Sequence, residues 1–223
     1  MGVKKYIMKT LKPALAIIIT LFLFNINGYS QKLNQIDFAI GPTYTGDIAV
    51  SKLASPSFMS FATFSYTMEL SYKKSITDRM QLGFGLGYSQ QRSLYQTDTI
   101  DYHYRRGYIE VPLIFRYKFN REAKNKFLLD AKIYNQFMTN IVSTQSGLEQ
   151  EIIERYTYED LAENNFKMYN IAVSLGVSYE RVFDNNISLS LSPFAKYGLF
   201  SFHKQTSSHD LSFGLLLGVG YRF

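Results

Sequence analysis

The sequence predicts an all-β protein, an eight-stranded antiparallel up-and-down transmembrane β-barrel with a filled lumen. Three observations predict this fold class. Apolar residues alternate with polar or small residues along eight segments, long and short connections take turns between them, and the chain begins like an export signal. We therefore expect a signal peptide over residues 1–30 and an outer-membrane β-barrel over residues 31–223.

The signal peptide is predicted from a basic start, an apolar run and a small-x-small site. The run Ala14–Phe24 is uninterrupted, and Gly28-Tyr29-Ser30 precedes Gln31. The basic residues before the run are Lys4, Lys5, Lys9 and Lys12. A helix that crosses a bilayer needs about 20 residues, so the run favours a cleaved signal over an N-terminal membrane anchor.

Charge and cysteine content exclude several classes of function. Without those four lysines, 20 of the 24 basic residues remain against 18 acidic ones, a net charge of +2. A nucleic-acid partner is therefore not expected. The chain has no cysteine, which excludes a disulfide framework, a thiolate metal site and a cysteine nucleophile.

Four segments show the clearest period-two alternation: 61–72, 80–91, 167–181 and 211–223. Four weaker segments complete the count: 36–44, 109–119, 127–137 and 187–191. Neighbouring residues of a strand point to opposite faces, so each segment has one apolar and one polar or small face. We expect Pro193 to bend or bulge the strand that begins at 187. The chain after the signal has no run of 18 apolar residues, which excludes a helical membrane protein.

The lengths of the connections indicate which way the barrel runs. They are 49–60, 73–79, 92–104, 120–126, 139–165, 182–186 and 199–210. Membrane barrels have short periplasmic turns and longer extracellular loops. Because the strand number is even, both termini are predicted to be periplasmic.

Alternation alone also fits a soluble sandwich or lipocalin-like barrel, and the composition of the polar faces separates the two. These faces are rich in Gly, Ser and Thr, which suit the narrow lumen of eight strands better than a water-facing surface. They also carry four acids and four bases: Glu69, Glu110, Arg116, Lys118, Asp130, Lys132, Glu180 and Arg222. Since buried charges must be paired, we expect a lumen ion-pair network that blocks a pore. The alternative is that these residues are solvated on an ordinary outer face.

One strand resembles a known family. The segment Tyr108–Phe119 reads YIEVPLIFRYKF and is similar to the YxEIPLxxKYxF strand of PorT-like outer-membrane β-barrel proteins of Bacteroidota. Leu82–Tyr88 and Phe213–Phe223 resemble that family too. The resemblance implies the barrel fold and insertion by machinery that recognises the last strand, with Phe223 as the barrel-assembly signal. It implies little about activity.

Hydrolase residues occur in the predicted extracellular loops, but their arrangement does not favour an enzyme. His203 and His209 share one predicted loop with Ser207, Ser208 and Asp210. A catalytic triad needs fixed hydrogen-bonded geometry, which a Ser/Thr-rich loop rarely provides. No HxH or HExxH spacing is present, so we predict no metal and no cofactor.

The connection 139–165 is long for an unstructured loop, and 147–155 and 158–163 have helical character. It carries six acids: Glu149, Glu151, Glu154, Glu159, Asp160 and Glu163. This acidic loop is a candidate partner-binding site for a basic partner, or for divalent cations that bridge lipopolysaccharide. The alternative is a solvated loop that keeps the surface soluble.

These observations favour a non-enzymatic barrel, either structural or an accessory subunit of a larger outer-membrane assembly. The competing classes are a narrow porin-like channel and a lipid-modifying outer-membrane enzyme. The expected partners are outer-membrane lipid and lipopolysaccharide, the barrel-insertion machinery and other outer-membrane proteins.

Overall fold

The computed structural model describes residues 34–49, 59–96, 101–120, 124–147, 152–157, 160–161, 166–201 and 208–223. The predicted signal peptide lies outside these residues. Among the described residues, no helix is long and apolar enough to cross a membrane.

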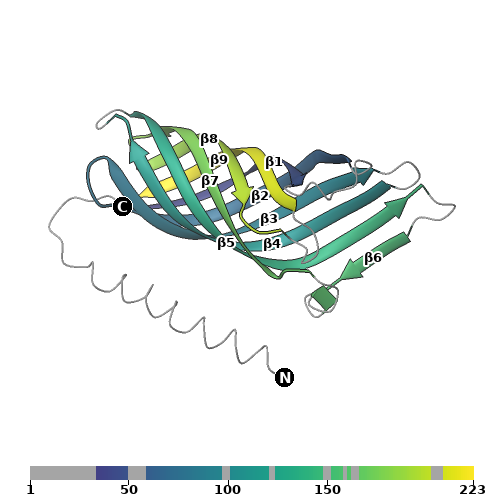
Figure 1. The fold of residues 1–223 in the computed structure, drawn as a ribbon. Helices are drawn as coiled ribbons and strands as arrows, with labels where there is room; N and C mark the ends of the chain where they lie inside the picture. The colour runs from purple at the N-terminus through teal and green to yellow at the C-terminus, as the bar shows by residue number, and fades with distance from the viewer. Residues whose placement is uncertain are drawn as a thin grey trace, which may run out of the picture. The chain divides into compact units, whose positions relative to one another are not determined.

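The described residues form nine antiparallel strands, eight of which close a barrel (Figure 1). The strands are β1 (Asn34–Ala49), β2 (Met59–Ser75), β3 (Met80–Gln96), β4 (Asp101–Lys118), β5 (Asn125–Ser146), β6 (Ile152–Tyr156), β7 (Tyr169–Val182), β8 (Ile187–Gly198) and β9 (Ser208–Arg222). Each barrel strand pairs with its neighbour, and β9 returns to pair with β1. This is the predicted eight-stranded antiparallel barrel.

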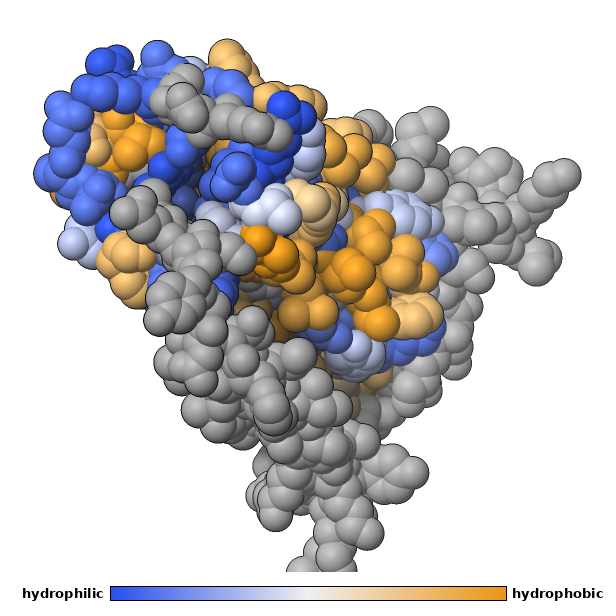
Figure 2. All heavy atoms as spheres, turned by 90° about the vertical axis from the view of Figure 1, so that its left-hand side faces the viewer, coloured by the Kyte–Doolittle hydropathy of each residue, from blue (hydrophilic) through white to orange (hydrophobic). Residues whose placement is uncertain are grey.

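The barrel wall is apolar outside and polar inside. Leu217 is 59 % exposed, whereas Leu216, which points to the other side of β9, is 5 % exposed. Large apolar side chains are exposed at alternate positions on the barrel strands, and Figure 2 shows hydrophobic residues gathered on the wall. A soluble barrel has the opposite polarity, so this wall is built to face hydrocarbon.

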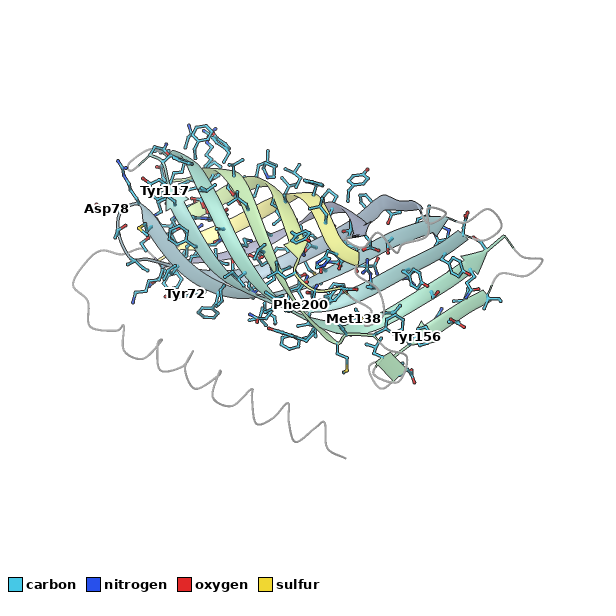
Figure 3. The ribbon with its side chains drawn as sticks, in the orientation of Figure 1. Tyr72, Asp78, Tyr117, Met138, Tyr156 and Phe200 are labelled. Carbon is cyan, nitrogen blue, oxygen red and sulfur yellow. The ribbon has the colours of Figure 1, made fainter. Side chains whose placement is uncertain are left out.

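One end of the barrel carries tight connections, and we call it the turn end. The turns at 76–79 and 183–186 lie here, and the backbones of Asn34 and Phe223 are hydrogen-bonded to each other. Asn186 has a φ of 64°, a left-handed conformation that asparagine tolerates in a turn. Figure 3 shows Asp78 and Tyr117 near this end, with Tyr156 toward the opposite, extended end.

At the extended end, the wall is longer on one side. β5 pairs with β7 only as far as Phe137, and then continues to Ser146 between β4 and β6. The helical expectation for 147–155 is wrong, because Ile152–Tyr156 forms a strand on the edge of β5. Pairing with this edge outweighs the local helical character. The expected loop 92–104 is also mostly strand, since β3 ends at Gln96 and β4 begins at Asp101.

Pro193 does not shift the register of β8. It pairs with Leu215 of β9, and the pairing of β8 with both neighbours keeps one register on either side of it. The expected bulge is therefore wrong. The alternation continues past the proline, and this continuity places Lys196 inside the barrel.

Candidate functional site

The lumen is filled by charged side chains and is the candidate site. Among the described residues, seven acids and seven bases point into it and are buried or nearly so. The acids are Asp37, Asp47, Glu69, Glu110, Asp130, Glu180 and Asp210, and the bases are Lys73, Arg106, Arg116, Lys118, Lys132, Lys196 and Arg222. The two signs balance, as buried charge requires.

Near the turn end, the carboxylates of Asp130 and Glu180 bind the guanidinium groups of Arg116 and Arg222. Arg116 donates to both oxygens of Asp130, over 2.5 Å from Nε and 3.0 Å from Nη2. Glu180 accepts from Arg222, and from Gln35 over 2.8 Å. Such forked, charge-assisted hydrogen bonds are the stronger kind, and here they join strands from different parts of the wall.

The middle of the lumen repeats this pairing with lysines. Lys73 Nζ lies 2.6 Å from Asp37 Oδ2, and Lys132 Nζ lies 2.8 Å from Glu69 Oε1. The Tyr134 hydroxyl donates to Glu69 over 3.2 Å. The Lys73–Asp37 pair joins the neighbouring strands β2 and β1, whereas the Lys132–Glu69 pair joins β5 to β2 across the lumen.

Toward the extended end, Glu110 and Arg106 are the centres. A single oxygen of Glu110 accepts from Lys196 over 2.8 Å and from Gln136 over 2.6 Å. The Arg106 guanidinium bonds Asp210 over 2.8 Å and Asp47 over 3.0 Å. Because Asp47 lies on β1 and Asp210 on β9, Arg106 reaches across the lumen from β4 to the strands that close the barrel.

An apolar cluster lies beside the ion pairs of Glu110 and Arg106, on the lumen side of β4. Tyr108, Met138 and Ile141 are buried there together with Leu161 and Phe166 from the connection between β6 and β7. Leu161 and Phe166 thus pack on the part of the wall where β5 no longer pairs with β7. The extended end is thus filled by apolar packing as well as by ion pairs.

Little free space remains within the network. A cavity of about 30 Å³ lies among Asp37, Glu69, Lys73, Arg116 and Lys132. About 10–15 Å³ of such a volume is enough to hold one water molecule, so the cavity has space for ordered water. It is far smaller than the roughly 300–1,000 Å³ of a pocket for a drug-sized ligand.

All eight charged residues that the sequence placed in the lumen lie there. Six others were missed: Asp37, Asp47, Lys73, Arg106, Lys196 and Asp210. Arg106 borders the expected loop 92–104, and Lys196 lies beyond the expected bulge at Pro193. Asp37 did carry a signal, since it lies between the apolar residues Ile36 and Phe38, whereas Lys73 is followed by Lys74 and the alternation is lost there.

The residues considered for catalysis do not converge in the described part of the chain. The Nδ1–H of His209 donates to the Gly198 carbonyl oxygen over 3.0 Å, and the imidazole ring stacks on Tyr197. Asp210, the next residue, points into the lumen to Arg106. His203 and Ser207 lie outside the described residues, as does the side chain of Ser208. Within the described ranges no group of three or more His, Asp or Glu side chains is placed to hold a metal ion.

The acidic loop is only partly described. Glu154 lies exposed on β6 and accepts from the Tyr156 hydroxyl over 2.6 Å, which raises the pKa of Tyr156 to about 12. Asp160 accepts from the backbone and hydroxyl of Thr157. The other four acids, Glu149, Glu151, Glu159 and Glu163, lie outside the described residues. The two described acids thus have local partners and do not form one acidic surface.

The last residue closes the sheet. The Phe223 amide donates to the Asn34 carbonyl over 2.9 Å, and the Asn34 amide donates to the Phe223 carbonyl over 2.8 Å. The Phe223 ring is half exposed on the outer face, stacked with Tyr221. Its backbone therefore has a structural role in joining the two ends of the sheet.

Comparison with known proteins supports the fold. No protein-family model and no curated protein matches the chain. It is similar in structure to the outer membrane protein OprG from Pseudomonas aeruginosa, with a TM-score of 0.50 and 5 % identity over 88 % of this chain and 98 % of that chain. It also matches the attachment invasion locus protein Ail of Yersinia pestis, with a TM-score of 0.45 and 12 % identity over 85 % of this chain and 99 % of that one.

A third similar structure is the outer membrane protease OmpT from Escherichia coli, with a TM-score of 0.43 and 9 % identity over 89 % of this chain and 99 % of that chain. At these identities the likeness concerns the fold alone. That fold is the closed antiparallel barrel, which hosts unrelated functions on different wall and loop residues.

Proposed function

We propose that this chain is a non-enzymatic outer-membrane β-barrel with periplasmic termini and a closed lumen, acting as a structural protein or as an accessory subunit of a larger outer-membrane assembly. The observation that carries the proposal is the filled lumen. Fourteen balanced charges occupy it, and the cavity among the central ion pairs is about 30 Å³. A barrel whose wall is cross-linked by these ion pairs and whose lumen is filled suits a scaffold better than a transport channel.

The orientation rests on the difference between the two ends. The turn end carries tight connections and the hydrogen-bonded pair Asn34–Phe223 of β1 and the residue after β9, whereas β3, β4 and β5 run on at the extended end. Short turns belong to the periplasmic side of known membrane barrels and long elements to the outside. We therefore assign the extended end to the cell exterior. The terminal Phe223 fits the expected signal for the barrel-insertion machinery, and the PorT-like resemblance agrees with this role.

The accessory role is supported by the edge of β6. In the described part of the chain, β6 ends the sheet order and pairs only with β5. Ile152 and Ile153 are exposed on this short strand. An unpaired strand edge can accept a strand from another protein, so β6 offers a place for an outer-membrane partner.

Single-channel recording in planar bilayers tests the closed lumen. We predict no discrete openings for the wild-type protein. A variant that removes both members of two pairs, Glu69→Ser/Lys132→Ser/Arg116→Ser/Asp130→Ser, leaves no unpaired partner in those pairs and enlarges the middle of the lumen. It should also show no openings, because Arg106 with Asp47 and Asp210 still closes the lumen toward the extended end. Discrete ion-selective openings of the wild type would establish the porin-like channel instead.

A direct assay of lipid modification distinguishes the proposed non-enzymatic role from that of a lipid-modifying enzyme. Lipopolysaccharide and phospholipids incubated with the purified protein should keep their acyl chains and headgroups, as followed by mass spectrometry. Loss of an acyl chain that is abolished in a His203→Ala/His209→Ala variant would replace the proposal with an enzyme.

A further inference from the structure

Three arginines lie in one row on the outer face of the wall at the extended end, with Val142 between the second and the third. Arg92 of β3 is paired directly with Arg105 of β4, Arg105 with Val142 of β5, and Val142 with Arg155 of β6. Directly paired residues share a face, and side chains opposite each other lie about 5 Å apart at Cβ. All three arginines are exposed. We call Arg92, Arg105 and Arg155 the arginine row.

The arginine row has no carboxylate partner among the described residues. Arg92 donates from Nη2 to a neutral partner, the Gln90 Oε1 atom, over 3.0 Å. Glu154, the neighbour of Arg155, is paired with Ser143 on the lumen side of the sheet and accepts from Tyr156. Like charges side by side repel one another, so an uncompensated row is unfavourable unless an anion binds to it.

The position of the row along the wall matches the edge of a membrane. Tyr117, whose hydroxyl accepts from Arg79 over 3.1 Å, marks the turn end of the apolar band on β4. Arg105 lies twelve residues further along the same strand and face. At about 3.4 Å per residue and a tilt of about 40°, this is roughly 31 Å along the barrel axis, just beyond an apolar band of about 25 Å. The row therefore lies at the level of lipid headgroups.

A cavity lies beside the arginine row. It has a volume of about 310 Å³ and is lined by Arg92, Arg105, His103 and Thr144, with Phe64 at its edge. It offers two guanidinium groups, an imidazole and a hydroxyl beside an aromatic ring. The planar fork of an arginine guanidinium matches two oxygens of a phosphate group.

We propose that the arginine row binds the phosphate groups of lipopolysaccharide in the outer leaflet, with the acyl chains against the apolar wall below. This rests on the proposed orientation, since the row meets that leaflet only if the extended end faces outward. The lipid anchors the longer side of the wall, β3 to β6, at a fixed depth. Arg106, directly behind Arg105, closes the lumen at the same level.

Native mass spectrometry of the detergent-purified protein, with bisphosphorylated lipid A as the probe, tests the site. The wild type should retain lipid A, and Arg92→Gln/Arg105→Gln/Arg155→Gln should bind it about tenfold or more weakly, because it loses charge-assisted bonds to phosphate. Arg181→Gln is the matched control: Arg181 is exposed on the outer face at the turn end and should bind as wild type does. Unheated gel mobility verifies that each variant is folded.

Two further experiments distinguish binding of the phosphate groups of lipid A from binding of its acyl chains and from binding of free phosphate. Dephosphorylated lipid A should bind the wild type and the triple variant equally weakly, and millimolar inorganic phosphate should not displace lipid A. Equal retention of lipid A by the triple variant, or displacement by free phosphate, would overturn the proposal. Orientation is read separately by labelling Ser146→Cys on intact cells, so a reversed barrel is distinguished from a missing site.

Discussion

At the residue scale, the stability of the lumen depends on charges that cannot be removed singly. Asp130 accepts two bonds from Arg116 and one from Ser178 over 2.5 Å, all buried. By contrast, Lys124 and Asp184 form an exposed pair 2.7 Å apart at the turn end. The hydrogen bond and charge of Lys124 lower the pKa of the Asp184 carboxyl, but water screens such a pair strongly.

The comparison of these two pairs gives a prediction. Asp130→Ala should lower the free energy of unfolding by about 3–5 kcal/mol, because it leaves the buried Arg116 guanidinium without its main partner. The double variant Arg116→Met/Asp130→Leu should be closer to wild type, since it removes both charges. Urea unfolding in lipid vesicles measures both. Asp184→Ala is the control and should leave the midpoint unchanged; a midpoint for Asp130→Ala equal to wild type would refute the network's role.

At the element scale, the barrel strands could be predicted well and their ends could not. Alternation in 80–91 and 211–223 identified β3 and β9 because lipid outside and a packed lumen inside constrain every residue there. Beyond the membrane that constraint ends. Residues 92–104 and 147–155 lack the strict pattern, and in their described parts strand pairing decides the structure, of 92–96 with β4 and of 152–155 with β5. The same loss of pattern hid Arg106 and the arginine row from the sequence.

The exposed edge of β6 gives the prediction at this scale. Ile152→Lys/Ile153→Lys places charges on the edge strand, which natural proteins use to prevent pairing with another chain. We expect the wild type to co-purify from native membranes with an outer-membrane protein in near-stoichiometric amount, and the variant to lose it. Asp78→Lys, at the turn end, is the control and should keep the partner. Retention by the β6 variant, or a solitary wild-type barrel, would contradict an assembly role through β6.

At the scale of the whole molecule, the fold and the candidate site have one explanation: the polarity of the barrel is the reverse of that of a soluble protein. Apolar residues cover the outside because lipid surrounds it. Side chains, here charged and paired, fill the inside because eight strands enclose a lumen just wide enough for them. The balance of charge in the lumen could be read in part from the sequence. Its pairings could not, because they depend on the register between strands distant in sequence, such as β4 with β9 through Arg106 and Asp210.

The outward direction of the apolar faces is the central claim, and spin labelling tests it most directly. The chain contains no cysteine, so single cysteines can be placed at each position from 213 to 219 of β9 and labelled in lipid vesicles. Labels at 213, 215, 217 and 219 should be relaxed by oxygen, which dissolves in hydrocarbon, and those at 214, 216 and 218 should be shielded. Shielded labels at the odd positions, or a water-soluble relaxant reaching them in the middle of the strand, would contradict a membrane-spanning barrel.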